Sequence, residues 1–172
     1  AELLRIAQIL DNEKINLREI NLSYTLNGKT LNVKYDVKNL TDDTMYFSIG
    51  AHPGFNCAIG DVIEFEQPET LATERIDKDN LIIPEKFAFM ENSKSFEITK
   101  EIFEPDALIL SDIQSEKLTI KGENEVEFTF GKCPFLGIWA KPGAPYVCIE
   151  PWYGVNDGRE VKDDISKKRG IQ

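Results

Sequence analysis

Histidine and cysteine are scarce in this sequence. The 172 residues include one histidine, His52, and three cysteines, at positions 57, 133 and 148. Three is an odd number and no two of the cysteines have C-x-x-C spacing, so neither a disulfide framework nor a zinc site is indicated. Few side chains remain from which a transition-metal site could be built. We therefore expect no bound metal and a reducing compartment.

An excess of positive charge and long hydrophobic runs are missing as well. Thirty acidic against twenty basic residues give a net charge of −10, which would repel a phosphate backbone or an anionic membrane. No hydrophobic run approaches the length of a membrane span. The first residues, AELLRIAQIL, do not have the pattern of a secretory signal peptide. We expect neither nucleic acid nor a membrane as a partner, and a cytoplasmic location.

The pattern that dominates the chain is alternation of hydrophobic and polar residues. Residues 20–26 and 31–37 alternate in this way around an Asn-Gly turn, which predicts a β-hairpin. Helical periodicity is weak, and it is strongest in residues 1–10 and 161–170. We predict a single all-β, predominantly antiparallel domain over residues 1–172, either a sandwich or a large barrel. Further strands are expected at 44–49, 61–66, 117–122, 125–130, 135–140 and 146–150.

His52 lies at the end of the expected strand 44–49, in the string HPGFNC. If the extended chain continues, it shares a face with Ser48 and Gly50, whose small side chains leave space beside the imidazole. Pro53 follows and ends the strand, because it has no N–H to donate. A lone histidine is more often structural than catalytic, and the strand pattern by itself leaves both roles open.

Glu150 has a similar position in the string YVCIEPWYGVND. It ends an expected strand, directly before Pro151, and Trp152 follows. A strand glutamate usually faces solvent, but this is one of the least polar stretches of the chain. Desolvation here would raise the pKa of the carboxyl group toward the range that suits a general base. His52 and Glu150 are therefore a candidate acid/base pair.

Four strings resemble one known family. FSIGAHPGFNC, FEPDALIL, FLGIWAKPGAP and YVCIEPWYGVND, in this order, are similar to the aldose 1-epimerase (galactose mutarotase) family, in particular to its LacX-like bacterial branch. The resemblance runs from about residue 21 to about residue 171 and depends on HPGFN and IEPWYG together. It implies a galactose mutarotase-like β-sandwich, or supersandwich. It also implies an isomerase of carbohydrate metabolism that interconverts the α and β anomers of a free aldose without cofactor or metal.

The resemblance also implies roles for individual residues. His52 would donate a proton to the ring oxygen of the sugar, and Glu150 would remove the proton from the anomeric hydroxyl. We therefore expect the two side chains in one concave site, on opposite sides of a space that fits one pyranose. Asp106 matches a position that hydrogen-bonds sugar hydroxyls, and Asn56 is expected to bind the substrate as well. Trp152 would stack on the apolar face of the pyranose, with a place in the buried core as the alternative.

Two features of the family are missing from this sequence. Its members carry an arginine and another histidine upstream, and this chain has no second histidine. The ending KKRGIQ comes before the last strands of the family. We therefore expect a domain that lacks upstream and C-terminal segments, with exposed strand edges, as a monomer or homodimer.

Two alternative functions stay open at this stage. One is a non-catalytic carbohydrate-binding β-sandwich with the same pocket, because a fold does not determine a function. The other is a mutarotase acting on a hexose 6-phosphate. That enzyme would need a cluster of basic residues for the phosphate, and the basic residues near the motifs, Lys132, Lys141 and Arg159, are not grouped in sequence.

Overall fold

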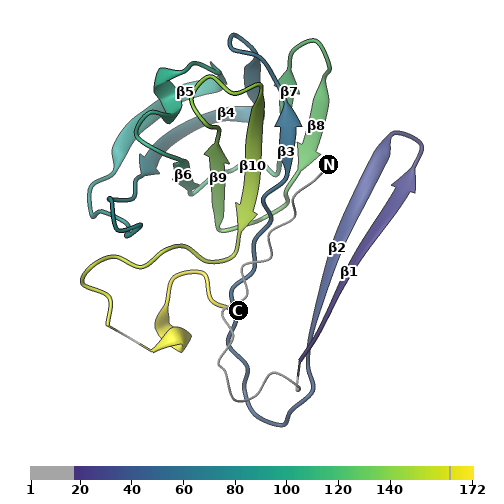
Figure 1. Ribbon diagram of the computed structural model, residues 1–172, viewed down its shortest axis with the longest axis vertical. Coiled ribbons are helices and arrows are strands. Elements are labelled where there is room, and N and C mark those ends of the chain that lie inside the picture. Colours follow the sequence, from purple (N-terminus) through teal and green to yellow (C-terminus); the bar gives the residue numbers. More distant parts are fainter. Residues whose placement is uncertain (1–17, 163) are drawn as a thin grey trace.

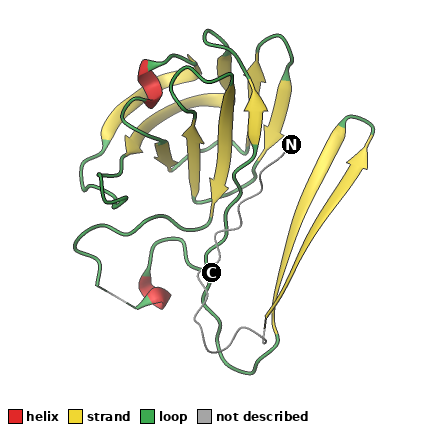
Figure 2. Cartoon of the chain, viewed as in Figure 1, coloured by secondary structure: helices red, strands yellow, loops and turns green. Residues whose placement is uncertain are grey.

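The computed structural model describes residues 18–162 and 164–172. Their strands form two antiparallel sheets, a two-stranded hairpin and an eight-stranded sheet (Figure 1). Figure 2 shows that strands and loops make up nearly all of the described chain, and its two helical segments are single 3₁₀ turns, η2 (Glu101–Phe103) and η3 (Ile165–Lys167). The prediction of an all-β, predominantly antiparallel fold is confirmed.

The hairpin has the register that its alternating sequence predicts. Strand β1 (Arg18–Asn27) pairs with β2 (Thr30–Asn39) around a tight turn in which Gly28 has a φ of +61°. A positive φ is easily adopted by glycine, which explains the Asn-Gly sequence of the turn. In Figure 1 the hairpin stands apart from the eight-stranded sheet. Its exposed hydrophobic residues include Ile20, Tyr24, Leu26, Leu31 and Val33.

The eight-stranded sheet mixes strands that are distant in sequence. Its order is β3, β10, β9, β6, β4, β7, β8, and β5 pairs with β4 outside this path. The long strand β4 loses regular register with β5 between Glu64 and Leu71, and such irregularities bend a strand. The bounds are β3 (Gly54–Asn56), β4 (Val62–Glu74), β5 (Phe87–Glu97), β6 (Leu108–Ser111), β7 (Lys117–Lys121), β8 (Val126–Thr129), β9 (Phe135–Trp139) and β10 (Tyr146–Trp152).

Three sequence-based expectations about local structure are wrong, and a fourth lies outside the described residues. Residues 44–49 are not a strand: Phe47 exchanges backbone hydrogen bonds with Gln172, and pairing with β10 begins only at the isolated bridge from Gly50 to Trp152. Strands β5 and β6 were not expected, because ENSKS interrupts the alternation in β5 and β6 is short and buried. The expected helix over 161–170 is reduced to the turn η3. The expected helix over residues 1–10 falls outside the part of the chain that the structure describes.

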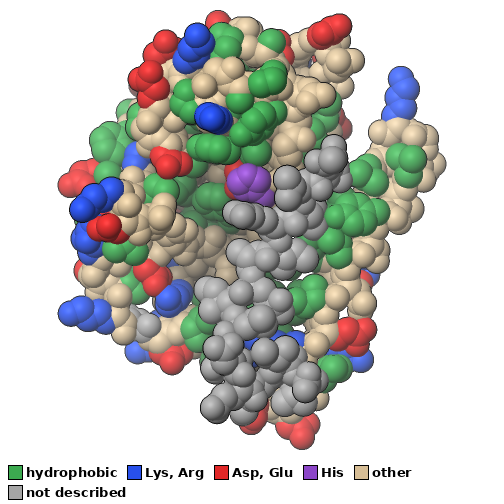
Figure 3. All heavy atoms as spheres, in the orientation of Figure 1, with side chains coloured by type: hydrophobic (Ala, Val, Ile, Leu, Met, Phe, Trp, Pro, Cys, Tyr) green, Lys and Arg blue, Asp and Glu red, His purple; other side chains and the backbone are tan. Residues whose placement is uncertain are grey.

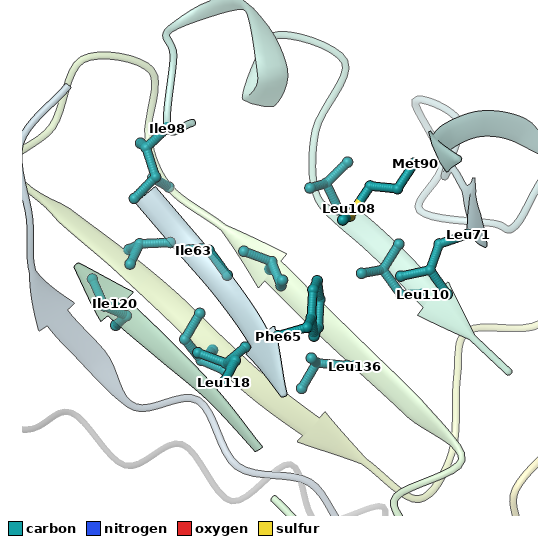
Figure 4. Close-up of a cluster of buried hydrophobic side chains, with 14 of the residues drawn as sticks. Ile63, Phe65, Leu71, Met90, Ile98, Leu108, Leu110, Leu118, Ile120 and Leu136 are labelled. Carbon is teal, nitrogen blue, oxygen red and sulfur yellow. The ribbon is translucent and has the colours of Figure 1, made fainter. Parts of the chain in front are cut away.

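The core lies against one face of the curved sheet (Figure 4). Alternate residues of the strands point into it, so each strand buries every second side chain. Full burial of one such aliphatic side chain stabilises the fold by about 2 kcal/mol. The most deeply buried side chains include Ile63, Phe65, Leu108, Leu110, Leu118, Ile120, Leu136, Ile138, Val147 and Ile149. The other face of β9 and β10 carries the residues of the candidate site.

A membrane span was not expected from the sequence. Among the helices of the described residues, none is long and apolar enough to cross a bilayer.

Candidate functional site

Residues 49–54 run antiparallel to β10 and bring His52 beside Glu150. The N–H of Tyr153 donates to the carbonyl of Ile49 over 2.8 Å, and the N–H of Ile149 donates to that of Pro53 over 3.2 Å. Gly50 pairs with Trp152, and Gly54 pairs with Cys148. Both pairs follow the same antiparallel register, which sets His52 directly opposite Glu150. Cross-strand neighbours share a face of the sheet, so the two side chains meet.

His52 and Glu150 are in direct contact. The imidazole Nδ1 lies 2.7 Å from the carboxylate Oε2. The carboxylate side chain is 4% exposed, whereas the imidazole is 43% exposed. Figure 3 shows the histidine reaching the surface among hydrophobic side chains. The two side chains were expected on opposite sides of a sugar-sized space, whereas in the structure they are in direct contact with each other.

The environment of Glu150 changes its acidity. Burial raises the pKa of its carboxyl group from 4.5 to about 7, and the negative charge of Asp106 acts in the same direction. A hydrogen bond from the Trp152 side chain lowers the pKa and so opposes part of this rise. A carboxyl group with a pKa near neutrality can take up and release protons at physiological pH. The desolvation expected from the flanking sequence is thus present.

The Trp152 ring packs against two glycines. A Cβ added to Gly50 would be 2.8 Å from Trp152 Cδ1, and one added to Gly137 would be 2.6 Å from Cζ2. The ring therefore occupies the space that side chains at these two positions would need. Its contact with a sugar stays a prediction.

An aromatic residue that sequence reasoning did not select lies closer to the imidazole. The Trp139 ring centroid is 6.4 Å from that of His52, with the planes inclined by 51°, and the Tyr146 ring follows at 6.3 Å from Trp139. Trp139 pairs with Cys148 across the two strands, on the same face as Glu150. The alternation of FLGIWA places Trp139 and Gly137 on one face, which could have identified it.

Asp106 lies in the loop before β6, close enough for its charge to affect Glu150. Its backbone has a φ of +77°, the left-handed region that non-glycine residues seldom adopt. Three hydrogen bonds stabilise this conformation. Its carboxylate accepts from the N–H of Ala107 over 2.6 Å, and Arg75 donates to the carbonyls of Asp106 and Ala107 over 2.7 and 3.0 Å.

Asn56 lies at the far end of β3. It pairs with Tyr146 and shares the face of Gly54 and, by the same alternation, that of His52. Four residues of extended chain separate it from His52, about 13 Å. Asn56 is therefore on the site face but at its periphery.

Within the described part of the chain, the structure brings together a group of possible metal ligands that the sequence did not suggest. Ligand atoms of His52, Cys148 and Glu150 all lie within 4.8 Å of one another. Burial, with a contribution from the charge of Glu150, raises the pKa of the Cys148 thiol to about 11. A thiol must lose its proton to bind a metal, so this group is not a ready metal site.

A second buried glutamate, Glu74, lies in the same row of the sheet. It pairs with Ile109, Ile109 pairs with Gly137, and Gly137 pairs with Glu150. Three strand spacings separate the two glutamates, about 14 Å. The guanidinium of Arg169 donates to both Glu74 oxygens, over 2.7 and 2.8 Å, and lowers the pKa of the carboxyl group.

Beside Arg169 is a hollow of about 530 Å³, away from the His52–Glu150 pair. Its basic residues are already paired with acids, because Lys86 lies 3.7 Å from Glu74 and 3.9 Å from Asp112. The lining residues are Lys86, Ser111, Asp112, Ile113, Cys133, Pro134, Phe135 and Arg169. The hollow therefore offers an anion little uncompensated positive charge.

Comparison with known sequences places these residues in a family context. A sequence model of the aldose 1-epimerase family matches residues 18–157, a range that includes His52, Asp106 and Glu150. The plasmid and chromosomal LacX proteins of Lactococcus lactis subsp. lactis are each 31% identical to the chain over 179 residues. These matches cover 94% of this chain and 58% of each LacX protein, so the chain spans less than two thirds of these relatives. The resemblance found in the motifs is confirmed.

Two solved structures share the fold. A galactose mutarotase-like protein from Lactobacillus casei ATCC 334 has a TM-score of 0.82 at 19% identity, covering 99% of this chain and 63% of that one. A galactose mutarotase related enzyme from Lactobacillus acidophilus has a TM-score of 0.78 at 23% identity, covering 99% and 61%. At such identities the likeness shows the fold, and the expected galactose mutarotase-like architecture is confirmed.

Proposed function

Because the chain belongs to the aldose 1-epimerase family, we propose that it interconverts the α and β anomers of a free aldose, with His52 and Glu150 as the catalytic residues. The observation that supports this most directly is the 2.7 Å contact between the imidazole and a buried carboxylate. The pKa of that carboxylate lies near neutrality. Such a pair can both give and take a proton without a large change in pH.

The chemistry of mutarotation fits a contacting pair. Ring opening breaks the bond between the anomeric carbon and the ring oxygen, so the ring oxygen gains a proton and the anomeric hydroxyl loses one. Both oxygens are bonded to the same carbon, and they therefore need an acid and a base that lie close together. His52 and Glu150 meet this requirement because they are cross-strand neighbours.

In the proposed reaction the pair carries one proton more than a neutral imidazole and an ionised carboxylate would. The imidazolium of His52 protonates the ring oxygen while the carboxylate of Glu150 accepts the proton of the anomeric hydroxyl. The carbonyl of the open-chain sugar then rotates, and the ring closes on the other face with the two roles reversed. General acid and base groups of this kind each contribute about 10² to 10⁴ in rate.

The sugar would be held by residues around the pair. We propose that the carboxylate of Asp106 accepts hydrogen bonds from sugar hydroxyls and that Asn56 contacts the substrate from the end of β3. Trp139, whose ring lies 6.4 Å from the imidazole, is the better placed aromatic for stacking on a pyranose. Affinity is expected to be weak, because sugar hydroxyls exchange hydrogen bonds with water for equivalent bonds in the site.

A neutral sugar fits the described charges better than a sugar phosphate. Lys132 lies 3.7 Å from Glu116, and Arg159 is paired with Asp77 and Asp79. The basic residues that were considered for a phosphate are thus dispersed or compensated among the described residues. We therefore keep the hexose 6-phosphate as the less favoured substrate.

The deciding experiment is polarimetry on freshly dissolved α-D-glucose and α-D-galactose with the 172-residue protein added. An enzyme accelerates the approach to anomeric equilibrium, and the Glu150→Gln variant does not. A carbohydrate-binding protein leaves the rate unchanged while the chemical shifts of His52 and Asp106 move with sugar concentration. If neither the rate nor these shifts respond, both functions are excluded.

We also propose a cytoplasmic location and a monomer or homodimer, without nucleic acid or membrane partners. The three cysteines are all free in the structure, which suits a reducing compartment.

A further inference from the structure

The Trp152 ring packs over Gly50 and Gly137 on the site face of the sheet, and we call this position its seat. Its five-membered ring lies over Gly50, where Cδ1 would be 2.8 Å from an added Cβ. Its six-membered ring lies over Gly137, where Cζ2, Cη2 and Cε2 would be 2.6, 2.9 and 3.0 Å from an added Cβ. The two glycines come from different segments on either side of β10. Together they set both ends of the indole.

The seat determines where the indole nitrogen points. Nε1 lies between Cδ1 and Cε2 in the ring, so the atoms that contact Gly50 and Gly137 are its two neighbours. The indole N–H has no acceptor capacity and can only donate. Trp152 donates a hydrogen bond to the side chain of Glu150, two residues earlier on the same strand. The residue that pairs with Glu150 on β9 is Gly137 itself.

The carboxylate is thus held from two directions. His52 approaches Oε2 from the neighbouring segment, and Trp152 donates from the same strand. Because Glu150 is buried, its carboxylate depends on protein donors for its hydrogen bonds. Without the indole N–H, the side chain would lose one of the contacts that define its rotamer.

We propose that Trp152 is a positioning residue, which uses its seat on Gly50 and Gly137 to hold the Glu150 carboxylate in the orientation that receives the proton of the sugar. This inference rests on the proposed function of Glu150 as the base. It assigns Trp152 to the carboxylate, whereas sugar stacking falls to Trp139. Gly50 and Gly137 contribute to this positioning, because a side chain at either residue would displace the Trp152 ring.

The test is Trp152→Phe, which keeps an aromatic ring and removes the N–H. Among residues 18–162 and 164–172, the charged and titratable groups around Glu150 are His52 on the adjacent segment, Cys148 on its own strand and Asp106 from the loop before β6, and none of them changes. We expect kcat to fall about tenfold, since hydrogen bonds to charged groups are among the stronger ones, and KM to stay within about twofold. The acid limb of the pH–rate profile should move to higher pH by about one unit, because the lost bond stabilised the ionised carboxylate.

Trp139→Phe is the matched control, because it makes the same substitution on the same face. The Trp139 indole is not among the groups that shift the pKa of Glu150. The acid limb of the pH–rate profile should therefore stay where it is in the wild type. Gly137→Ala should shift the acid limb as Trp152→Phe does, by displacing the ring. The Gly137→Ala change should cost little further rate in the Trp152→Phe background, where the smaller ring leaves room for the methyl group.

A direct titration separates this inference from the proposed function. The midpoint of the Glu150 carboxyl ¹³C resonance can be followed by NMR whether or not the protein turns over sugar. A higher midpoint in Trp152→Phe shows that the indole stabilises the ionised Glu150 carboxylate. If the wild type nevertheless fails to accelerate mutarotation, the proposed function fails while this contact stands. An unchanged midpoint overturns it, and so does a raised KM with unchanged kcat, which would return Trp152 to sugar stacking.

Discussion

Glu150 and Glu74 are two buried glutamates on one face of the eight-stranded sheet, each about 3% exposed. They lie in the same row, joined through Gly137 and Ile109. Yet the pKa of Glu150 is raised to about 7, whereas that of Glu74 is lowered. Two carboxyl groups that are buried to the same extent thus have pKa values shifted in opposite directions.

The neighbours of the two carboxylates explain the difference. Glu74 accepts two hydrogen bonds from the fixed positive charge of Arg169 and has Lys86 nearby. Glu150 faces an imidazole that is charged only when it is protonated, a neutral indole and the negative charge of Asp106. A permanent cation compensates the cost of burial, and a titratable partner does so only in part. Glu74 is therefore suited to hold the structure and Glu150 to move protons.

The largest expected effect is on the rate. Glu150→Gln keeps the size of the side chain and removes the base, and His52→Asn removes the acid. Each should slow mutarotation by about two to four orders of magnitude, measured by polarimetry. Glu74→Gln should leave the rate close to that of the wild type, because Glu74 does not contact the pair. A normal rate in Glu150→Gln would remove the central assignment.

The next largest effect is on stability, and here Glu74→Gln should cost more than Glu150→Gln. Glu74→Gln leaves the Arg169 guanidinium without its carboxylate and should lower the free energy of unfolding by about 2 kcal/mol. That is less than for a fully buried pair, because Arg169 is half exposed. Glu150→Gln should lower stability little or raise it at neutral pH. Urea denaturation of the two variants tests this, and equal losses would contradict the proposed division of roles.

The pH dependence of stability should separate the two residues. The lowered pKa of Glu74 gives a contribution that is present above its unfolded pKa of about 4.3 and is lost as the pH falls through its folded pKa. The raised pKa of Glu150 gives a contribution that is complete below its unfolded pKa and is lost as the pH rises through about 7. As the pH rises from about 4.3 to about 7, the raised pKa of buried Glu150 should progressively lower the stability of the wild type, by about 4 kcal/mol in total at about 1.36 kcal/mol per pKa unit.

Thermal or urea unfolding from about pH 2 to about pH 8 measures both contributions, because the Glu74 contribution is lost only below its unfolded pKa. Glu150→Gln should flatten the decline toward neutral pH, and Glu74→Gln should flatten the decline in acid. If Glu150→Gln leaves the neutral limb unchanged, its carboxyl group does not titrate there in the folded protein.

The smallest expected effect concerns Asp106. Asp106→Asn removes a negative charge that raises the pKa of Glu150, so the acid limb of the pH–rate profile should move to lower pH by less than about one unit. Trp152→Phe moves the same limb in the opposite direction. A rise in KM is expected as well if Asp106 binds sugar hydroxyls. No movement of the limb would show that the charge of Asp106 is screened from Glu150.

The local features of the fold could be predicted from short stretches of sequence. The hairpin follows from alternation and an Asn-Gly turn, and strands β9 and β10 follow from alternation alone. The prolines after His52 and Glu150 do not end strands as expected, because β10 continues through Pro151 to Trp152 and residues 44–49 form no strand. The apolar surroundings of Glu150 did indicate its raised pKa. Strand β6 could not be predicted in this way, because it has only four residues and is buried on both faces, so its sequence does not alternate.

The chain's own sequence determined which residues share a face, because side-chain direction in an extended backbone depends only on neighbouring residues. Only the tertiary structure decided which faces meet and at what register. It set His52 opposite Glu150 across 98 residues of chain, seated Trp152 on Gly50 and Gly137, and brought Arg169 to Glu74 across 95 residues. These contacts depend on strand pairing between distant segments, and they determine whether a buried carboxylate holds the fold or exchanges a proton.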